Sequence, residues 1–380
     1  MPTVRQDLEN LLADCVRRDA SDLHLAPGLA PYFRVHGVLA PAEGLSAVAP
    51  EQLEALAREL MASYNAASLQ STGSVDGAIS AADRTRFRFN VFRRQGQLAI
   101  ALRRLEDRFR SLTDLGMPES LYQLCDLPDG LIVVCGPTGA GKSTTLATMI
   151  DRINQTRQCH IVTIEDPIEY VHTPARSLVN QRQVGSDAGS FNDALVASLR
   201  QDPDVILVGE IRDLATIRTA ITAAETGHLV LTTVHAGDCV GAIERLVSVF
   251  SADEQTGIRR QLSLVLRTII AQHLLIADGP AGLASKAANK RSRVPASEVL
   301  MISPAVANLI ATAKSSQIYS SMETGAAQGM QTLEQDLAKL LVGNMITEST
   351  AFTMARNPAV VRDRAALLRK PGARLTGGAR

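Results

Sequence analysis

The chain has 380 residues, which at about 150 residues per domain predicts two or three domains. Its 39 basic and 39 acidic side chains cancel, so no overall field attracts nucleic acid or an acidic membrane surface. No apolar stretch approaches the roughly 18 to 20 residues that cross a bilayer, and charged residues near the start exclude a secretory signal. We therefore expect a cytoplasmic protein that reaches a membrane only through partners.

The first third of the chain predicts a small α+β domain over residues 1–106. It opens with apolar residues at helical spacing and then becomes extended. Residues 85–92 alternate between polar and apolar side chains, and residues 97–105 predict a partner strand. Arg88 and Arg103 lie on these two strands. From the residues alone, both arginines are best explained as parts of solvated strand faces.

The rest of the chain predicts a linker and a larger α/β domain. Residues 107–117 lack a sustained period and are expected to form the linker. Over residues 118–357, short apolar runs alternate with longer helical patterns, which is typical of a mainly parallel sheet flanked by helices. After Ser251 the pattern is mostly helical, interrupted by a predicted loop at residues 278–293. Residues 358–380 predict a disordered tail.

The strongest motif is a phosphate loop. Residues 136–143 (GPTGAGKS) fit the pattern G-x-x-x-x-G-K-[ST] and lie between a predicted strand and a predicted helix. Such a loop turns backbone N–H groups and a helix N-terminus toward phosphates. Lys142 would reach the outer phosphates, and the Ser143 hydroxyl would ligate Mg²⁺. The motif predicts that ATP with Mg²⁺ is held by Gly136, Pro137, Thr138, Gly139, Ala140, Gly141, Lys142, Ser143 and Thr144.

Two further strand-like runs end in carboxylates. Residues 204–210 (DVILVGE) form an apolar run that delivers Glu210 to the carboxyl end of a strand, where open α/β sheets bind their ligands. We expect Glu210 to organise Mg²⁺ or to orient water. Residues 163–169 (TIEDPIE) gather like charges, which is costly unless a cation or a proton is handled there. Glu165 is the favoured candidate for the base that orients the attacking water, and Asp166 is the second.

Two histidines, His228 and His235, flank the apolar run at residues 229–233. Each one alone is more often structural than functional, and a third metal ligand is missing. Beside a triphosphate, however, a histidine can sense the γ-phosphate through a hydrogen bond. Both residues are therefore candidates for that contact.

Taken together, these motifs resemble the type IV pilus retraction ATPases, the PilT and PilU group within the bacterial secretion ATPases. The resemblance extends to about residue 357 and rests on motifs in the family's order. They are ASDLHL at 20–25, the phosphate loop, an Asp box at 163–169, a Walker B stretch at 205–210 and a His box at 226–235. The family implies a PAS-like N-terminal domain joined to a RecA-like ATPase domain in a homohexamer. It also implies an inner-membrane pilus platform protein and a paralogous retraction ATPase as partners.

The resemblance also assigns roles to single residues. It makes Glu165 a catalytic glutamate and Glu210 the Walker B glutamate. It places His228 and His235 in the His box. The last match is that of Arg88 and Arg103 to the family's paired arginines, which approach the γ-phosphate from the N-terminal domain.

Two features bear on the subfamily. Pilus assembly and type II secretion ATPases usually carry a longer N-terminal extension and a tetracysteine zinc module, whereas the five cysteines here are scattered. Retraction is therefore favoured over assembly. The retraction signature Ala-Ile-Arg-Asn-Leu-Ile is replaced at residues 305–310 by AVANLI, with Ala307 in the arginine position. A PilU-like accessory role, an assembly or secretion ATPase and a non-hydrolysing nucleotide-binding scaffold remain alternatives. An aromatic content of 3% argues against a nucleic-acid translocase.

Overall fold

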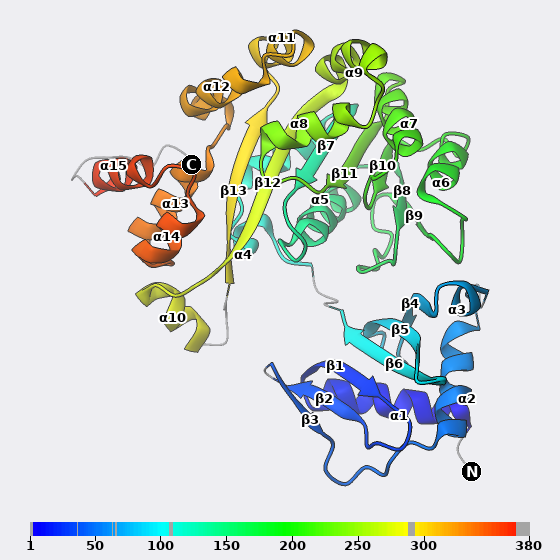
Figure 1. The fold of residues 1–380 in the computed structure, drawn as a ribbon. Coiled ribbons are helices and arrows are strands. Elements are labelled where there is room, and N and C mark those ends of the chain that lie inside the picture. Colours follow the sequence, from blue (N-terminus) through cyan, green and yellow to red (C-terminus); the bar gives the residue numbers. More distant parts are fainter. Residues whose placement is uncertain are drawn as a thin grey trace. The chain divides into compact units, whose positions relative to one another are not determined.

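A computed structural model describes residues 3–35, 37–62, 64, 67–105, 109–287 and 293–369. The chain divides into two compact units, which are drawn in Figure 1. Unit 1 comprises Met1–Arg108, Ile164–Thr173 and Gln181–Ala194, and unit 2 comprises Phe109–Thr163, Pro174–Asn180 and Leu195–Arg380. Unit 1 thus contains the predicted N-terminal domain together with two segments that the sequence assigned to the ATPase domain.

Unit 1 is built on a six-stranded antiparallel sheet with the order β3-β2-β1-β6-β5-β4. Phe87 and Phe89 alternate inward along β5 and pack with Leu8 and Leu12 of α1, so the predicted helix and strand pair are confirmed. The hairpin turn between β5 and β6 has Gln95 and Gly96 in the left-handed region. The elements are α1 (Val4–Arg17), β1 (Ala20–Leu25), β2 (Tyr32–Val35), β3 (Val38–Pro41), α2 (Pro50–Met61), α3 (Ala67–Ser71), β4 (Ser74–Ser80), β5 (Arg86–Arg94) and β6 (Gln97–Arg104).

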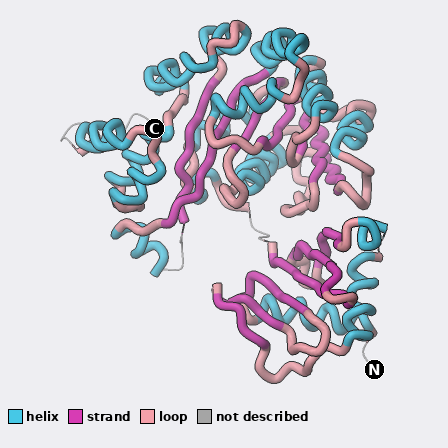
Figure 2. Tube along the Cα trace, viewed as in Figure 1, coloured by secondary structure: helices cyan, strands magenta, loops and turns pink. Residues whose placement is uncertain are grey.

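The second sheet has seven strands in the order β13-β12-β7-β11-β10-β8-β9 (Figure 2). Strands β12, β7, β11 and β10 run parallel, and only the pairing of β12 with β13 is antiparallel among the pairings described. The strands are β7 (Gly130–Cys135), β8 (His160–Glu165), β9 (Leu178–Gln183), β10 (Val205–Val208), β11 (Leu229–Val234), β12 (Leu266–Ile276) and β13 (Arg293–Met301). This sheet confirms the predicted mainly parallel α/β architecture.

Every residue of β7, β10 and β11 is buried, because helices cover both faces of these central strands. Ile132 and Val134 of β7 pack with Leu146, Met149 and Ile150 of α5 in one core. The helices are α4 (Leu112–Leu115), η1 (Glu119–Asp126), α5 (Lys142–Thr156), α6 (Phe191–Ser198), α7 (Leu214–Glu225), α8 (Cys239–Ser248), α9 (Ala252–Val265), α10 (Pro280–Ala287), α11 (Pro304–Ala311), η2 (Ser315–Gln317), α12 (Ile318–Thr324), η3 (Gly325–Gln328), α13 (Leu333–Val342), α14 (Glu348–Met354) and α15 (Pro358–Leu368). Within the described ranges, none of these helices is both long enough and apolar enough to span a bilayer.

Three predictions for the C-terminal third are wrong. The mostly helical pattern after Ser251 in fact includes β12 and β13, because a continuous apolar run does not distinguish a buried strand from a buried helix. The disordered tail does not begin at residue 358, since α15 starts there and buries Val361 and Ala365 in a C-terminal core. Two apolar anchors one helical turn apart were too weak a pattern to predict this helix. The predicted loop at residues 278–293 is also wrong over half of its length, because Pro280–Ala287 forms α10 and Arg293 begins β13. Residues 288–292 of that loop, and the tail from residue 370 onward, lie outside the described residues.

Candidate functional site

The phosphate loop begins at the carboxyl end of a buried central strand. Cys135, the last residue of β7, pairs in parallel register with Val234, the last residue of β11. Gly136 and His235 therefore follow at neighbouring positions on the same edge of the sheet. This is the edge at which open α/β sheets bind their ligands.

Glycine is required in the phosphate loop because β12 passes directly beside it. Gly136, Gly139 and Gly141 all have positive φ angles, which other residues rarely adopt. A Cβ atom at Gly136 would lie 2.2 Å from the main-chain oxygen of Gln272 in β12, and one at Gly141 would lie 2.9 Å from the side-chain nitrogen of Gln272. The Gln272 amide oxygen also accepts a hydrogen bond at 2.8 Å from the hydroxyl of Thr145 in α5. Gln272 therefore fixes the loop and the first turn of α5 against the sheet.

The loop and the start of α5 have the properties of a phosphate site. Gly141 at the N-cap supplies no side-chain cap, so the positive end of the α5 dipole faces the loop. The buried Lys142 donates hydrogen bonds of 3.0 Å to the carbonyl oxygens of the first two loop residues. Burial lowers the pKa of Lys142, and nearby Cys135 and Glu210 offset only part of this effect. A bound triphosphate would restore the favourable environment of the ammonium group, so the residues fit the predicted ligand.

Glu210 lies just beyond β10 and is held by two basic side chains. The hydroxyl of Thr233 donates to the carbonyl oxygen of Gly209 at 2.7 Å, which attaches this segment to β11. Arg212 Nη2 lies 2.6 Å from Glu210 Oε1, and His235 Nε2 lies 3.6 Å from Glu210 Oε2. The Arg212 side chain is 70% exposed, and an ion pair with such a partner contributes at most about 1 kcal/mol. A metal ion or a water molecule can therefore displace Arg212 from the carboxylate at little cost.

The structure brings only one of the two predicted histidines to this group. His228 precedes β11, whereas His235 follows it, and a strand of six residues separates its ends by roughly 20 Å. His228 Nδ1 contacts the carbonyl oxygen of Ala223 at 2.9 Å, in the turn that follows α7. Within one chain, His228 is therefore at the opposite edge of the sheet from Glu210.

Glu165 ends β8 and belongs to unit 1, where a glutamine orients it. Gln181 Nε2 donates to Glu165 Oε1 at 3.2 Å and to the carbonyl oxygen of Tyr170 at 2.8 Å. The Gln181 oxygen accepts from the backbone N–H of His172 at 2.7 Å. The amide group of Gln181 is thus fixed at both ends, which limits the positions open to the Glu165 carboxylate.

Arg88 and Arg103 face each other directly across β5 and β6, which confirms the predicted strand pairing. Like charges in opposed positions are destabilising, and each arginine here has an acidic neighbour. Arg88 Nη2 lies 3.8 Å from Asp76, and Arg103 Nε lies 2.9 Å from Asp22. Burial acts to raise the pKa of Asp22, but hydrogen bonds from Ser21 and Arg103 outweigh it, so the net pKa is below the ordinary value. The Asp22 carboxylate therefore stays charged and compensates Arg103. An approach of the two arginines to a phosphate stays a prediction.

Sequence reasoning did not single out Gln181, Arg212 or Gln272 as functional residues. Arg212 carries a usable signal, because residues two apart in an extended segment point to the same side, which places its charge beside Glu210. Gln272 sits inside a long apolar run, where one polar residue hints at a specific buried contact. The partners of Gln181 lie at the end of β8 and in the segment that follows it, and no sequence pattern links these residues to Gln181.

Comparison with known proteins agrees with this geometry. The family model described as type II/IV secretion system protein matches residues 2–350. The chain belongs to this family. The type IV pilus retraction ATPase PilT of Pseudomonas aeruginosa is 40% identical over 352 residues, which are 93% of this chain and 99% of PilT. The type IV pilus ATPase PilU of the same organism is 36% identical over 349 residues, or 92% of this chain and 88% of PilU.

A solved structure extends the comparison to three dimensions. The crystal structure of the pilus retraction motor PilT with bound ADP superposes with a TM-score of 0.84 at 40% identity. The match covers 94% of this chain and 99% of that one. The predicted RecA-like ATPase fold, and the resemblance to the retraction ATPases, are confirmed.

Proposed function

We propose that this protein is an ATP-hydrolysing motor that retracts type IV pili and so drives twitching motility. The observation that carries the proposal is likeness to PilT over nearly the whole chain, combined with a phosphate loop, Glu210 and His235 at one edge of the sheet. Members of this family are ATPases, and the chain retains the groups that hydrolysis requires. A non-hydrolysing scaffold would be expected to have lost Glu165 or Glu210, and both are present.

The residues divide the work of hydrolysis between binding and catalysis. Lys142 and the N–H groups of the loop hold the outer phosphates in place. Ser143 and Glu210 would hold Mg²⁺, which neutralises charge on the phosphates when it is bound with ATP. Glu165, oriented by Gln181, would take the proton of the attacking water.

The remaining candidates act on charge that develops at the γ-phosphate. His235 would donate a hydrogen bond to it, and Arg88 and Arg103 would stabilise the transferring phosphoryl group. The same role for His228 needs a second subunit or a large movement, given its place at the far end of β11.

Coupling to the pilus requires more than one chain. We place the protein in a cytoplasmic homohexamer that works at the inner membrane through a pilus platform protein, because the family resemblance implies this assembly. Hydrolysis would move the N-terminal domain as a rigid body against the ATPase domain, and successive movements around the ring would return pilin to the membrane.

A second candidate function is that of an accessory, PilU-like motor. The segment equivalent to the retraction signature forms α11, which buries Val306 and Ile310 and leaves Ala307 partly exposed. The position at which the retraction family has arginine therefore lies at the surface, where an arginine side chain could contact a partner protein. In this chain Ala307 cannot make that contact. A paralogous retraction ATPase would then share the load.

Deleting the gene distinguishes these functions. A main retraction motor predicts cells with excess surface pili and no twitching, because assembly continues without removal. An accessory motor predicts normal piliation with twitching that fails under load. Cells without pili would contradict retraction and indicate an assembly ATPase. Complementation with the intact gene, scored by pilus counts and colony spreading, is the control.

The paired arginines give a biochemical test of the proposed mechanism. Arg88→Ala or Arg103→Ala is expected to slow ATP turnover more than it weakens nucleotide binding, because contacts that strengthen in the transition state act on rate. Steady-state kcat and the Kd of a fluorescent nucleotide measure the two effects separately. Arg94→Ala, at an exposed position of the same strand, is the matched control. Unchanged turnover in both variants would return these arginines to a purely solvated role.

A further inference from the structure

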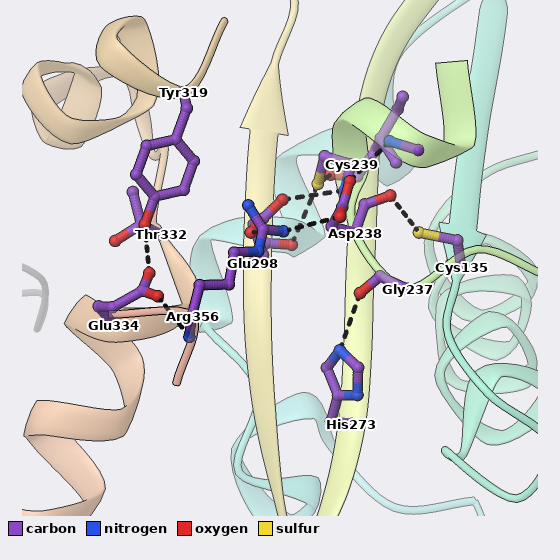
Figure 3. A network of polar contacts seen from close by, with 12 residues as sticks. Cys135, Gly237, Asp238, Cys239, His273, Glu298, Tyr319, Thr332, Glu334 and Arg356 are labelled. Atoms are coloured by element: carbon purple, nitrogen blue, oxygen red, sulfur yellow. Dashed lines mark hydrogen bonds and ion pairs between the residues drawn. The ribbon is translucent and has the colours of Figure 1, made fainter. Parts of the chain in front are cut away.

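Residues 236–239 follow His235 and are called the His235 segment. Contacts from several elements hold this segment in place (Figure 3). The Gly237 carbonyl oxygen contacts His273 Nε2 of β12 at 3.0 Å. The Asp238 carbonyl oxygen accepts from the thiol of Cys135, the last residue before the phosphate loop, at 3.6 Å. These contacts attach the segment to the two strands that flank the loop.

Two carboxylates of this region converge on one arginine from the C-terminal helices. Arg356, just beyond α14, places Nη2 at 3.1 Å from Asp238 Oδ2 and at 3.1 Å from Glu298 Oε2. Glu298 belongs to β13, and its other oxygen accepts from the backbone N–H of Cys239 at 2.9 Å. Figure 3 shows the guanidinium group between the two acids. Arg356 therefore closes a network around the end of the His235 segment and the start of α8.

The same arginine is anchored within the C-terminal helices. Its guanidinium lies over the Tyr319 ring of α12, 5.4 Å from the centroid, and its backbone N–H donates to Glu334 of α13 at 3.1 Å. The Tyr319 hydroxyl donates to the other oxygen of Glu334. A shift of α12 or α13 would therefore move Arg356, and with it the contacts to Asp238 and Glu298.

The charges make Arg356 difficult to replace. Glu298 is buried, and burial raises the pKa of its carboxyl group, although the Cys239 amide and Arg356 counteract this. Burial alone would lower the pKa of Arg356, but Glu298, Asp238 and Glu334 outweigh it and raise the net value. Without the guanidinium, two neighbouring carboxylates would repel each other at the base of the His235 segment.

We propose that Arg356 is a positioning residue for ATP hydrolysis, which holds residues 236–239 so that His235 stays beside Glu210. The inference rests on the proposed ATPase function and adds a link between the C-terminal helices and the hydrolytic group. Nucleotide binding should depend on this link far less, since the phosphate loop is fixed separately by β7 and Gln272.

The test compares variants by kcat and by the KM for ATP. Arg356→Gln is expected to lower kcat roughly 10-fold while the KM changes less than about twofold, because small misplacements of catalytic groups act on rate and can cost up to 10²-fold. Arg356→Lys keeps the charge but not the fork that reaches both acids, so an intermediate kcat is expected. Arg362→Gln is the matched control, because Arg362 also stacks on an aromatic ring, that of Phe352, at 5.3 Å, but lies on the exposed side of α15. Its kcat should equal that of the wild type.

A double variant separates positioning from general damage. If Arg356 acts through His235, then Arg356→Gln should slow turnover little further in a His235→Ala background. Additive losses in kcat, a wild-type kcat in Arg356→Gln, or an equal loss in Arg362→Gln would each overturn the inference. Assays run below the unfolding temperature of every variant, and Arg356→Lys carries the same test if Arg356→Gln does not fold. A wild-type protein without ATPase activity would contradict the proposed function as well.

Discussion

Replacing Glu210 by glutamine is expected to leave ATP binding intact and to slow hydrolysis at least ~100-fold, the lower end of general-base effects. Glutamine is nearly isosteric with glutamate, so the attachment of this segment to β11 through Thr233 should survive. It cannot carry the charge that organises Mg²⁺ or water, and it also loses the ion pair with Arg212. Binding without turnover should therefore trap the protein with nucleotide bound.

Single-turnover hydrolysis and the Kd of a fluorescent ATP analogue measure the two parts of this prediction. Glu254→Gln is the matched control, since Glu254 of α9 forms a carboxylate–arginine pair with Arg218 of α7 at the same separation of 2.6 Å. A wild-type rate in Glu210→Gln would show that β10 does not end at the reacting phosphate.

Mixing Glu210→Gln into wild-type protein tests for the hexameric ring, because trapped subunits in a shared ring should lower the ATPase activity per wild-type subunit. An unchanged activity per wild-type subunit, together with light scattering that shows only monomer in ATP and Mg²⁺, would contradict a hexamer.

Replacing Lys142 by alanine is expected to abolish ATP binding and hydrolysis together. Lys142 supplies charge to the bound triphosphate itself, and its ammonium group joins the first two carbonyl groups of the loop. Both the attraction for ATP and the shape of the empty loop are therefore lost. In thermal unfolding, ATP with Mg²⁺ should raise the Tm of the wild type and of Glu210→Gln, but not that of Lys142→Ala.

Lys314→Ala removes an exposed lysine from the same unit and should respond to nucleotide like the wild type. An undiminished Tm shift in Lys142→Ala would show that the loop binds nucleotide without its lysine. The two variants together thus separate ground-state binding from the chemical step, and each tests a different side of the site.

Features encoded in short segments were predictable from the sequence. The phosphate loop needs only its own residues between a strand and a helix, and the hairpin of β5 and β6 needs only alternation and a turn. The position of Arg88 opposite Arg103 follows from that hairpin. The roles of the two histidines were harder to predict. His228 and His235 flank β11 in the sequence, but the length of that strand places them at opposite edges of the sheet.

Features that depend on contacts between distant segments were not predictable. Gln272 becomes important only because β12 runs beside β7, and the apolar run that contains it resembled a helix. Arg356 lies in a polar stretch near the end of the chain, and its acidic partners, Asp238 and Glu298, are more than 50 residues away in sequence. No periodicity reports such pairings, since each is decided by the packing of whole elements.

The close approach of Gly136 to β12 has a mechanical consequence. The space between them does not admit even a methyl group, so neither can shift toward the other. β12 is in turn paired with β13 along its length from Thr268 to Ile276, which stiffens it. The phosphate loop and the β12–β13 hairpin are therefore expected to move together as one rigid body.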